Sequence, residues 1–422
     1  MKTRTILISG GGVAGRALAF WLVRHGHRPT IVERAPGPRH GGYKVDIRGA
    51  AVEAIRRMGL LEEVRRASTD MRMASFVDDA GKQVAIMDAE LFGGRSGDDV
   101  EIVRGDLTRI LEASTDADTE TIYDDSITGI NETSDGVVVT FAGGGSRTFD
   151  LVVGADGLHS GVRRLVFGPE SEHLHHLGYD IAIFSVANRL GIDRAEVTLA
   201  TPGRTAILYS TRASSGAKAM FLFASGSTTH DRGDPTQQRQ IVADAFAGRG
   251  WEVPRLLEEM WASPDFYFDS VSQIHMDRWS TTRVALVGDA AYASSPASGQ
   301  GTSVALVGAY VLAGELAANS DDVGSAFLRY EAAMRTFVDL NQQLAGRNIK
   351  GMVLASRAQV RFQMLMLRLL PHLPGRERIA SRISDGIRSA ATSIDLDEYG
   401  TGTLGMPSDP LAAGRPRIEG WI

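Results

Sequence analysis

The sequence predicts an α/β fold in which an N-terminal domain with a parallel sheet carries an inserted, mostly antiparallel sheet and a long helix near the C-terminus. Three observations support this prediction. A strand, turn, helix and second strand are legible in residues 6–33, strand-like runs dominate residues 172–277, and a helical pattern runs from about 324 to 370. The first pattern is the βαβ unit of Rossmann-like folds. The predominance of strand-like runs in residues 172–277 indicates a separate antiparallel sheet.

The first turn carries glycines at a fixed spacing. Gly10, Gly12 and Gly15 form a GxGxxG pattern between the apolar strand and the helix. The first glycine permits a tight turn, the second lets a pyrophosphate approach the backbone, and the third lets the helix pack close to the strand. The backbone N–H groups at Val13 and Ala14 would face the phosphates at the positive end of the helix dipole.

An acidic residue ends the second strand of this unit. Glu33 lies about 20 residues after the turn, where a carboxylate would accept hydrogen bonds from a ribose. Arg34, the next residue, belongs to the same predicted cofactor-binding set. A merely flexible glycine loop would not explain Glu33. The unit therefore predicts a dinucleotide site.

Composition bounds the class of protein. The 422 residues suffice for two or three domains, and 43% hydrophobic with 23% charged residues is ordinary for a globular chain. The net charge of -6 suggests no nucleic-acid partner. The absence of cysteine excludes disulfides and thiolate metal sites and fits a cytoplasmic protein. Since no apolar stretch approaches about 20 residues, we expect no membrane partner. We predict no metal site.

The remaining elements follow in order. Before the inserted sheet we expect a strand at 44–48, a helix at 50–58, strands within 72–100 around a turn at 78–81, a helix to 113 with Asp106 as its N-cap, and strands at 121–123, 126–132, 137–141 and 149–153. The inserted part should contain strands at 181–187, 196–200, 206–210 and 219–224 and helices at 236–247 and 255–261. Thereafter we expect a strand at 284–287 and helices at 302–318, 324–370 and 376–391, with Pro371 and Pro374 ending the long one.

Two further strand ends carry signatures. Asp156 opens the stretch DGLHSGVRR, and Asp289 lies within GDAAYASSPASGQG. In this order with the glycine turn, the motifs resemble the FAD-dependent aromatic hydroxylases, the para-hydroxybenzoate hydroxylase-like flavoprotein monooxygenases. Residues 41–60, residues 103–111 and the long helix look most like the tetracycline-inactivating flavin monooxygenases. The resemblance spans nearly all of residues 1–370 and is thin in 172–277.

The resemblance implies roles for the residues that follow Asp289. That carboxylate would bind the ribitol hydroxyls of FAD, with a helix N-cap as the alternative role. The segment beside the isoalloxazine would place Pro296 near the oxygen-transferring centre. A helix starting there would direct its positive end at the flavin and stabilise its anionic reduced form. The family pattern assigns cofactor contacts in this segment to Pro296, Gly299, Gln300, Gly301 and Thr302.

Other positions match the family less directly. Arg104 matches an arginine that contacts the cofactor, and Arg48 matches a basic residue near it, although a surface ion pair is an equal alternative. Asp156 is implicated in holding the fold around FAD. Arg163 and Arg164 would supply charge for pyrophosphates or cap the motif helix.

Three positions depart from the family pattern. Tyr292 stands where many relatives have His, and Ser303 and Gly308 replace Asn and Asp. The resemblance therefore does not assign the flavin contacts near Ser303.

The function implied is a single-component monooxygenase. NADH or NADPH would reduce FAD, O2 would form a flavin C4a-hydroperoxide, and one oxygen atom would enter an aromatic or polycyclic small molecule. Tyr209, Phe221 and Phe223 could line an apolar substrate pocket or belong to the core. No catalytic side chain is assigned with certainty, and a monomer and a homodimer are both open.

Competing readings remain. A halogenase is disfavoured because its tryptophan-rich segment is missing. A nicotinamide-dependent dehydrogenase would leave the second and third motifs unexplained. A flavin-binding protein that sequesters a drug-like ligand without turnover would carry the same motifs.

The predicted domains are discontinuous. Residues 1–72, 101–171 and 278–323 would bind FAD, residues 73–100 and 172–277 would bind substrate, and residues 324–422 would form a bridging helix and helical tail.

Overall fold

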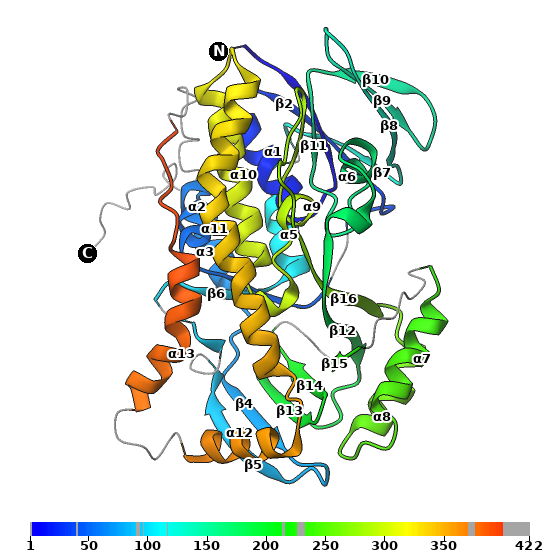
Figure 1. The fold of residues 1–422 in the computed structure, drawn as a ribbon, viewed down its shortest axis with the longest axis vertical. Helices are drawn as coiled ribbons and strands as arrows, with labels where there is room; N and C mark the ends of the chain where they lie inside the picture. Colours follow the sequence, from blue (N-terminus) through cyan, green and yellow to red (C-terminus); the bar gives the residue numbers. More distant parts are fainter. Residues whose placement is uncertain are drawn as a thin grey trace, which may run out of the picture.

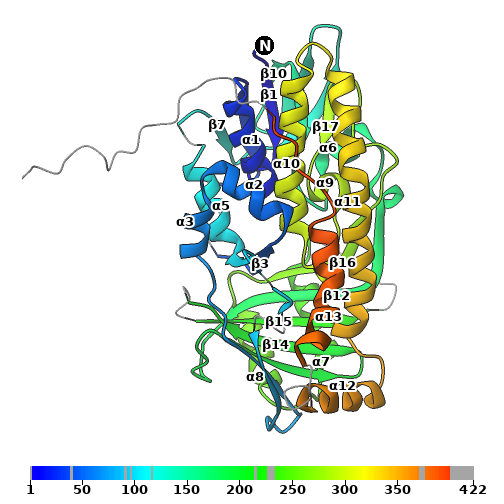
Figure 2. The same cartoon turned by 90° about the vertical axis from the view of Figure 1, so that its left-hand side faces the viewer.

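A parallel sheet and a larger, mostly antiparallel sheet occupy opposite ends of an elongated molecule, and a long helix runs beside both (Figures 1 and 2). This computed structural model describes residues 2–38, 41–89, 93–95, 97–115, 117–212, 216–225, 233–369 and 376–399, with the backbone alone at 376–383. Pro371, Pro374 and the tail after residue 399 lie outside the described residues. The predicted fold class is confirmed.

Within the described residues the strands form four sheets. The five-stranded parallel sheet has the order β17 (Val284–Leu286), β11 (Leu151–Gly154), β1 (Thr5–Ser9), β2 (Arg28–Glu33), β7 (Glu120–Tyr123). The seven-stranded sheet has the order β16 (Tyr267–Ile274), β12 (Leu174–Val186), β15 (Ala217–Ala224), β14 (Arg204–Ser210), β13 (Ala195–Thr201), β4 (Met73–Val77), β5 (Gln83–Asp88). The small sheets are β10 (Ser146–Phe149), β9 (Val137–Phe141), β8 (Ile127–Glu132), and β3 (Lys44–Ile47) with β6 (Val100–Val103).

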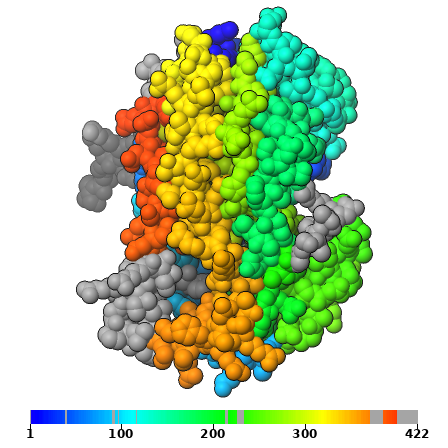
Figure 3. Space-filling model, viewed as in Figure 1, coloured from blue at the N-terminus to red at the C-terminus, as the bar shows by residue number. Residues whose placement is uncertain are grey.

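The helices cover these sheets. In chain order they are α1 (Val13–Arg24), α2 (Ala50–Met58), α3 (Leu61–Arg66), α5 (Arg104–Ala113), α6 (Gly161–Val166), α7 (Pro235–Phe246), α8 (Val253–Ala262), α9 (Asp289–Tyr292), α10 (Gly301–Ala318), α11 (Val323–Met352), α12 (Arg357–Leu369) and α13 (Arg376–Ala391), with short 3-10 turns at Glu170–Glu172 and Pro296–Ser298. In Figure 3, α11 and α13 form much of the face that is visible.

The parallel sheet is buried on both faces, which explains its nearly continuous apolar strands. Ile6, Leu7 and Ile8 of β1 are fully buried. Strand β1 lies between β2 and β11, and all three run in the same direction. Strand β17 pairs in parallel with β11. The carboxyl ends of β1, β11 and β17 therefore lie side by side at one edge, where ligands of open α/β sheets bind.

The seven-stranded sheet has two buried faces with different partners. Phe221 and Phe223 of β15 pack with Phe246 of α7 on the outer face. Leu222, on the opposite face, packs with Ala297 and with Ile349 of α11. All its pairings are antiparallel except that of β13 with β4. The inner face thus contacts the loop that leads into α10.

Two predicted elements differ in the structure, and one observed strand had no prediction. The strand expected at 149–153 is divided at Asp150, whose carboxylate accepts hydrogen bonds from the backbone and hydroxyl of Thr5. Asp106 lies in the first turn of α5, and the N-cap is Val103, because β6 extends to that residue. Strand β16 was not predicted.

The long helix expected at 324–370 is two helices. It breaks between Met352 and Arg357. There the Met352 carbonyl accepts a hydrogen bond from the hydroxyl of Thr205, and the Leu354 carbonyl accepts one from the backbone of Gly203. Contacts with the β13–β14 turn therefore replace helical hydrogen bonds, and α12 begins in a new direction.

Helix α10 is the one described helix long and apolar enough to cross a membrane. Most of that stretch, 78%, is buried inside the protein. It packs against α1, α2 and α11, which accounts for its apolar composition.

Candidate functional site

The three motif corners meet at the edge of the parallel sheet. A Cβ atom placed on Gly10 would lie 2.5 Å from the carbonyl oxygen of Ala155, and one placed on Gly288 would lie 2.9 Å from the Cβ atom of Ala14. Both glycines have positive φ angles, of 107° and 65°. The first corner therefore touches both the second and the third. Contacts this close leave no room for side chains there.

The glycines of the first corner differ in their surroundings. A Cβ atom on Gly15 would lie 1.9 Å from the carbonyl oxygen of Gly10, so this glycine is required for packing. A Cβ atom on Gly12 would have as its nearest neighbour the Nη2 atom of Arg104, at 3.6 Å. Gly12 therefore faces open space at the N-terminus of α1, where the first backbone N–H groups have no partner within the helix. This arrangement fits a phosphate group.

Glu33 is oriented over the same turn. Its carboxylate accepts hydrogen bonds from the backbone N–H of Gly11 and of Ala35, each at 2.8 Å. Each carboxylate oxygen has two lone pairs, so acceptor capacity remains for ribose hydroxyls. Arg34, the neighbouring residue, is exposed.

Two charged side chains, Asp289 and Arg104, lie beside this corner, on a surface that we call the cleft. Asp289, the first residue of α9, is exposed, yet burial raises the pKa of its carboxyl, and Arg104 opposes part of that rise. Arg104 is also exposed, and interaction with Tyr43 and then with Asp289 raises its pKa. Each of these two side chains is exposed and interacts electrostatically with the other. The pair offers a cation and a hydrogen-bond acceptor.

The third corner continues into a loop held by serines. The Ser298 hydroxyl donates to the Ser295 carbonyl at 2.8 Å and accepts from the backbone N–H of Gln300 at 3.0 Å. Pro296 and Gly299 are exposed while their neighbours are buried. The loop thus presents small residues to the cleft.

Helix α10 starts directly after this loop. Gly301 and Thr302 begin it, and a Cβ atom on Gly301 would lie 3.7 Å from the Oδ1 atom of Asp289. The positive end of α10 and the carboxylate therefore lie together. Gln300 is fully buried, and neither its amide nitrogen nor its amide oxygen has a hydrogen-bond partner within the described residues.

Asp156 and Arg163 hold the second corner together. The Asp156 carboxylate accepts hydrogen bonds from the backbone of Gly161 and Val162 and from the hydroxyl of Ser9. Arg163 is fully buried and donates to the carbonyl of Ala290. Both residues thus tie α6 to the neighbouring corners.

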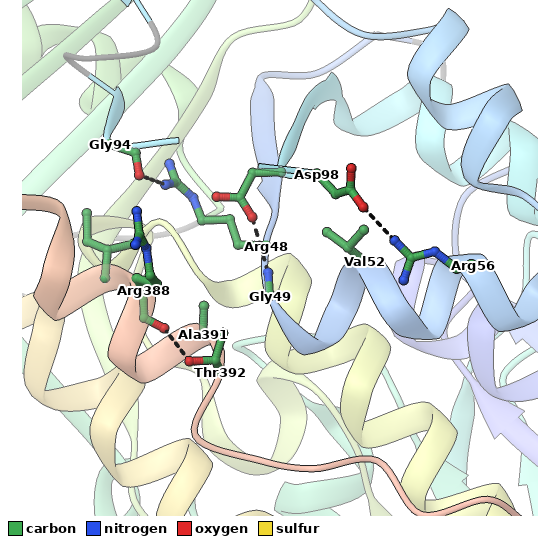
Figure 4. Close-up of a pocket in the computed structure, with 11 residues that line it drawn as sticks. Arg48, Gly49, Val52, Arg56, Gly94, Asp98, Arg388, Ala391 and Thr392 are labelled. Carbon is green, nitrogen blue, oxygen red and sulfur yellow. Dashed lines mark hydrogen bonds and ion pairs between the residues drawn. The ribbon is translucent and has the colours of Figure 1, made fainter. Parts of the chain in front are cut away.

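Arg48 lies near Gly94 and Gly49 in a separate pocket (Figure 4). Its guanidinium donates to the Asp46 carboxylate and to the carbonyls of Gly93 and Gly94. It lines a pocket of about 260 Å³ between α2 and α13. The alternative of a surface ion pair is not supported, because the side chain is buried and its ion pair with Asp46 is largely buried too; the cofactor contact stays a prediction. Its backbone N–H binds the hydroxyl of Ser303.

The departures from the family pattern at Tyr292 and Gly308 are linked. A Cβ atom on Gly308 would lie 2.0 Å from the Tyr292 hydroxyl oxygen, so the tyrosine occupies space that a side chain on α10 would need. That hydroxyl lies 2.8 Å from the hydroxyl of Tyr330, which donates to the Leu286 carbonyl. Tyr292 therefore links the end of α9 to α11.

The aromatic residues predicted to bind substrate are divided between the two faces of the sheet. Phe221 and Phe223 pack in the core with Phe246 of α7, so a place in the pocket is not supported for them. Tyr209 faces the other way, among Met71 and Ala89. Periodicity could not distinguish these positions, because both faces of β15 are apolar.

Two tyrosines at the cleft were missed. The rings of Tyr43 and Tyr267 lie 6.0 Å apart, and Tyr267 is 38% exposed. Burial, followed by Asp269, raises the pKa of Tyr267 well above its ordinary value. The Tyr267 hydroxyl donates to the Asp269 carboxylate, which also contacts His159. A prediction of β16 would have revealed Tyr267.

Fold and corners together define a class of FAD-dependent enzymes. Residues 3–342 match the family model described as FAD binding domain, and the chain belongs to this family, as a flavoprotein monooxygenase of the aromatic hydroxylase type.

Particular relatives narrow the comparison. The chain is 40% identical over 342 residues to a flavin-dependent monooxygenase of Legionella longbeachae, covering 81% of this chain and 88% of that one. Among solved structures it is similar to the tetracycline destructase Tet(51), at 33% identity and a TM-score of 0.83, covering 94% of this chain and 100% of that one. Tet(55) is 36% identical with a TM-score of 0.82, covering 94% and 99%.

Proposed function

We propose that this monooxygenase takes electrons from NADH or NADPH and inserts one oxygen atom of O2, by the flavin hydroperoxide route, into a phenolic polycyclic compound of the tetracycline type. The observation that carries the proposal is the loop Pro296–Ser298. Its exposed Pro296 borders the cleft, and Ala297 packs against the inner face of the seven-stranded sheet. A flavin ring beside the loop would therefore face that sheet. The similarity to two tetracycline destructases supports the substrate class.

In this proposal the cofactor spans the three corners. The adenosine ribose would bind Glu33, the pyrophosphate would lie over Gly12 beside Arg104, and the ribitol would bind Asp289. FAD supplies the electron transfer and oxygen activation. The chain would hold the ring dry, because water entering such a site diverts reducing equivalents to H2O2.

We also propose the domain division expected from the sequence. Residues 1–72, 101–171 and 278–323 would hold FAD, residues 73–100 and 172–277 would choose the substrate, and residues from 324 onward would brace the two. The pairing of β4 with β13 supports the assignment of residues near 73 to the substrate part. Tyr209 remains a proposed substrate contact on the inner face.

The test uses purified holoprotein with tetracyclines and simple phenols. We expect some tetracyclines to stimulate oxidation of NADH or NADPH, to consume O2 and to gain the mass of one oxygen atom, with little H2O2. Ligand binding without stimulated oxidation would instead identify a sequestering protein. Stimulation by simple phenols alone would overturn the substrate class and leave the oxygenase chemistry intact.

A further inference from the structure

Helix α12 presents an apolar stripe to solvent. Its exposed large side chains recur at helical spacing: Phe362 is 66%, Leu365 52%, Met366 38% and Leu369 42% exposed. Residues three and four apart lie on one side of a helix, so these four form a continuous stripe, which we name the α12 outer face. Contiguous apolar surface of this kind marks an interaction site more often than scattered single residues do.

The opposite side of α12 packs against the seven-stranded sheet. Met364 and Leu367 pack against the cluster that contains Phe76, Ala85 and Met87 on β4 and β5. These contacts hold α12 flat on the sheet and direct the stripe outward. With 13 residues, the helix is about 20 Å long.

Positive charge accompanies the stripe. Arg357, Arg361 and Arg368 on α12 are exposed, and none has an ion pair within the described residues. Arg347 and Lys350, at the end of α11, are exposed as well. Residues 340–369 contain these five basic residues and no Asp or Glu, although the whole chain has a net charge of -6. Positive charge is therefore concentrated in this segment of the chain.

The position of α12 suits a flat surface. Both ribbon views place it at the end of the molecule farthest from β1, lying across the long axis (Figures 1 and 2), and Figure 3 shows it on the outside. A protein that binds amphipathic helices usually encloses them in a groove. Here β5 occupies one side of the helix, so only the outer ridge is available.

We propose that the α12 outer face docks on an anionic lipid surface. An amphipathic helix with aromatic and aliphatic residues on one face and basic residues at its border lies in the interface of a bilayer, with the apolar side chains below the headgroups. The arginines would contact the lipid phosphates. This docking involves no membrane-spanning segment and does not depend on the substrate proposed above.

The experiment is vesicle flotation with the full-length holoprotein. Vesicles of phosphatidylcholine alone are compared with vesicles of equal parts phosphatidylcholine and phosphatidylglycerol, at low and high salt. We expect binding to the anionic vesicles only, weakened by salt. The double variant Phe362→Ser with Leu365→Ser should reduce partitioning at least about tenfold. Arg361→Gln with Arg368→Gln should reduce it by roughly tenfold.

Leu328→Ser is the matched control. Leu328 lies on α11 and is 70% exposed, so its replacement removes an exposed apolar residue elsewhere and should leave binding unchanged. Circular dichroism and flavin content verify that each variant is folded. The proposal is overturned if the unmodified protein floats with neither vesicle, or if the α12 variants bind like the control. A third outcome would also overturn it: light scattering shows a dimer that the apolar variant abolishes, and no vesicle binds. A second copy of this chain would then cover the α12 outer face.

Discussion

Gly12 and Gly15 belong to one motif but have different roles. Of these two, Gly15 is the one at which a Cβ atom would collide with backbone, at 1.9 Å from the Gly10 carbonyl oxygen. We predict that Gly12→Val yields folded protein with little FAD, since the side chain would fill the space proposed for the pyrophosphate. Gly15→Val should give unfolded or aggregated protein. Circular dichroism and flavin absorbance separate the two outcomes, and a flavin-replete Gly12→Val protein would refute this placement of the pyrophosphate.

Asp289 is predicted to strengthen FAD binding and to lower the stability of the apoprotein. Burial raises the pKa of its carboxyl, so the ionised form is disfavoured in the folded protein. Asp289→Asn removes that cost and should leave the apoprotein as stable or more stable near neutral pH. It should weaken FAD binding by about 10- to 100-fold, the usual effect of losing hydrogen bonds to a charged acceptor. Titration with FAD and thermal unfolding test both parts, and unchanged FAD affinity would contradict the assignment.

His27 is predicted to make the fold sensitive to acid. It is buried, its Nδ1 accepts a hydrogen bond from the backbone N–H of Arg4, and burial together with Arg4 lowers its pKa from 6.5 to about 4. A lowered pKa means that the unfolded chain protonates first. The stabilisation is therefore complete above pH 6.5 and is lost as the pH falls to about 4, by at most about 3 kcal/mol.

The check is urea unfolding of the unmodified protein and of His27→Gln across that pH interval. Glutamine can still accept the hydrogen bond but does not titrate there. The free energy of unfolding of the variant should therefore depend less on pH. If the free energies of unfolding of the two proteins depend on pH in the same way, groups other than His27 cause the sensitivity to acid.

At the scale of elements, α9 and α10 are fitted to each other through Tyr292 and Gly308. We predict that Gly308→Ala destabilises the protein by about 1 to 3 kcal/mol, the usual cost of overpacking. Tyr292→Phe alone should cost about 1 kcal/mol through the lost hydrogen bond to Tyr330. Because phenylalanine lacks the hydroxyl that the added methyl group would meet, the double variant should lose less than the sum. If the losses in free energy of unfolding, measured by chemical unfolding, are additive, Tyr292 and Gly308 are not packed against each other as described.

Elements with local signals could be predicted from sequence. The unit β1–α1–β2 was legible because its glycines, its apolar strand and Glu33 each have a local physical reason. Helix α13 was predicted with the correct bounds. Strand β16 was missed because Asp269, Ser270, Ser272 and Gln273 interrupt its apolar pattern.

Features decided by tertiary contacts could not be predicted. The residues between α11 and α12 have no helix-breaking proline, and contacts with Thr205 and Gly203 end the helix. The side of the sheet on which Phe221 lies is likewise set by packing with α7. At the candidate site, the sequence indicated the three motif corners, whose cofactor contacts stay a prediction, while Tyr267 was found only through its position in space.

At the scale of the whole molecule, the parallel sheet brings together corners that are far apart in sequence. Gly10, Ala155 and Gly288 belong to different strand ends, and their contacts require strand order β17–β11–β1. The loop after Asp289 then reaches the seven-stranded sheet through Ala297. The proposed cofactor would therefore run from Glu33 to the junction of the two sheets.

The most direct test of this arrangement is titration of the apoprotein with FAD and, separately, with FMN. FMN lacks the adenosine half and would leave Glu33 without its proposed partner. If one nucleotide spans all three corners, one FAD should bind per chain, at least about 100-fold more tightly than FMN, as several charged hydrogen bonds would provide. Equal affinity for FAD and FMN, or the absence of flavin binding, would contradict it.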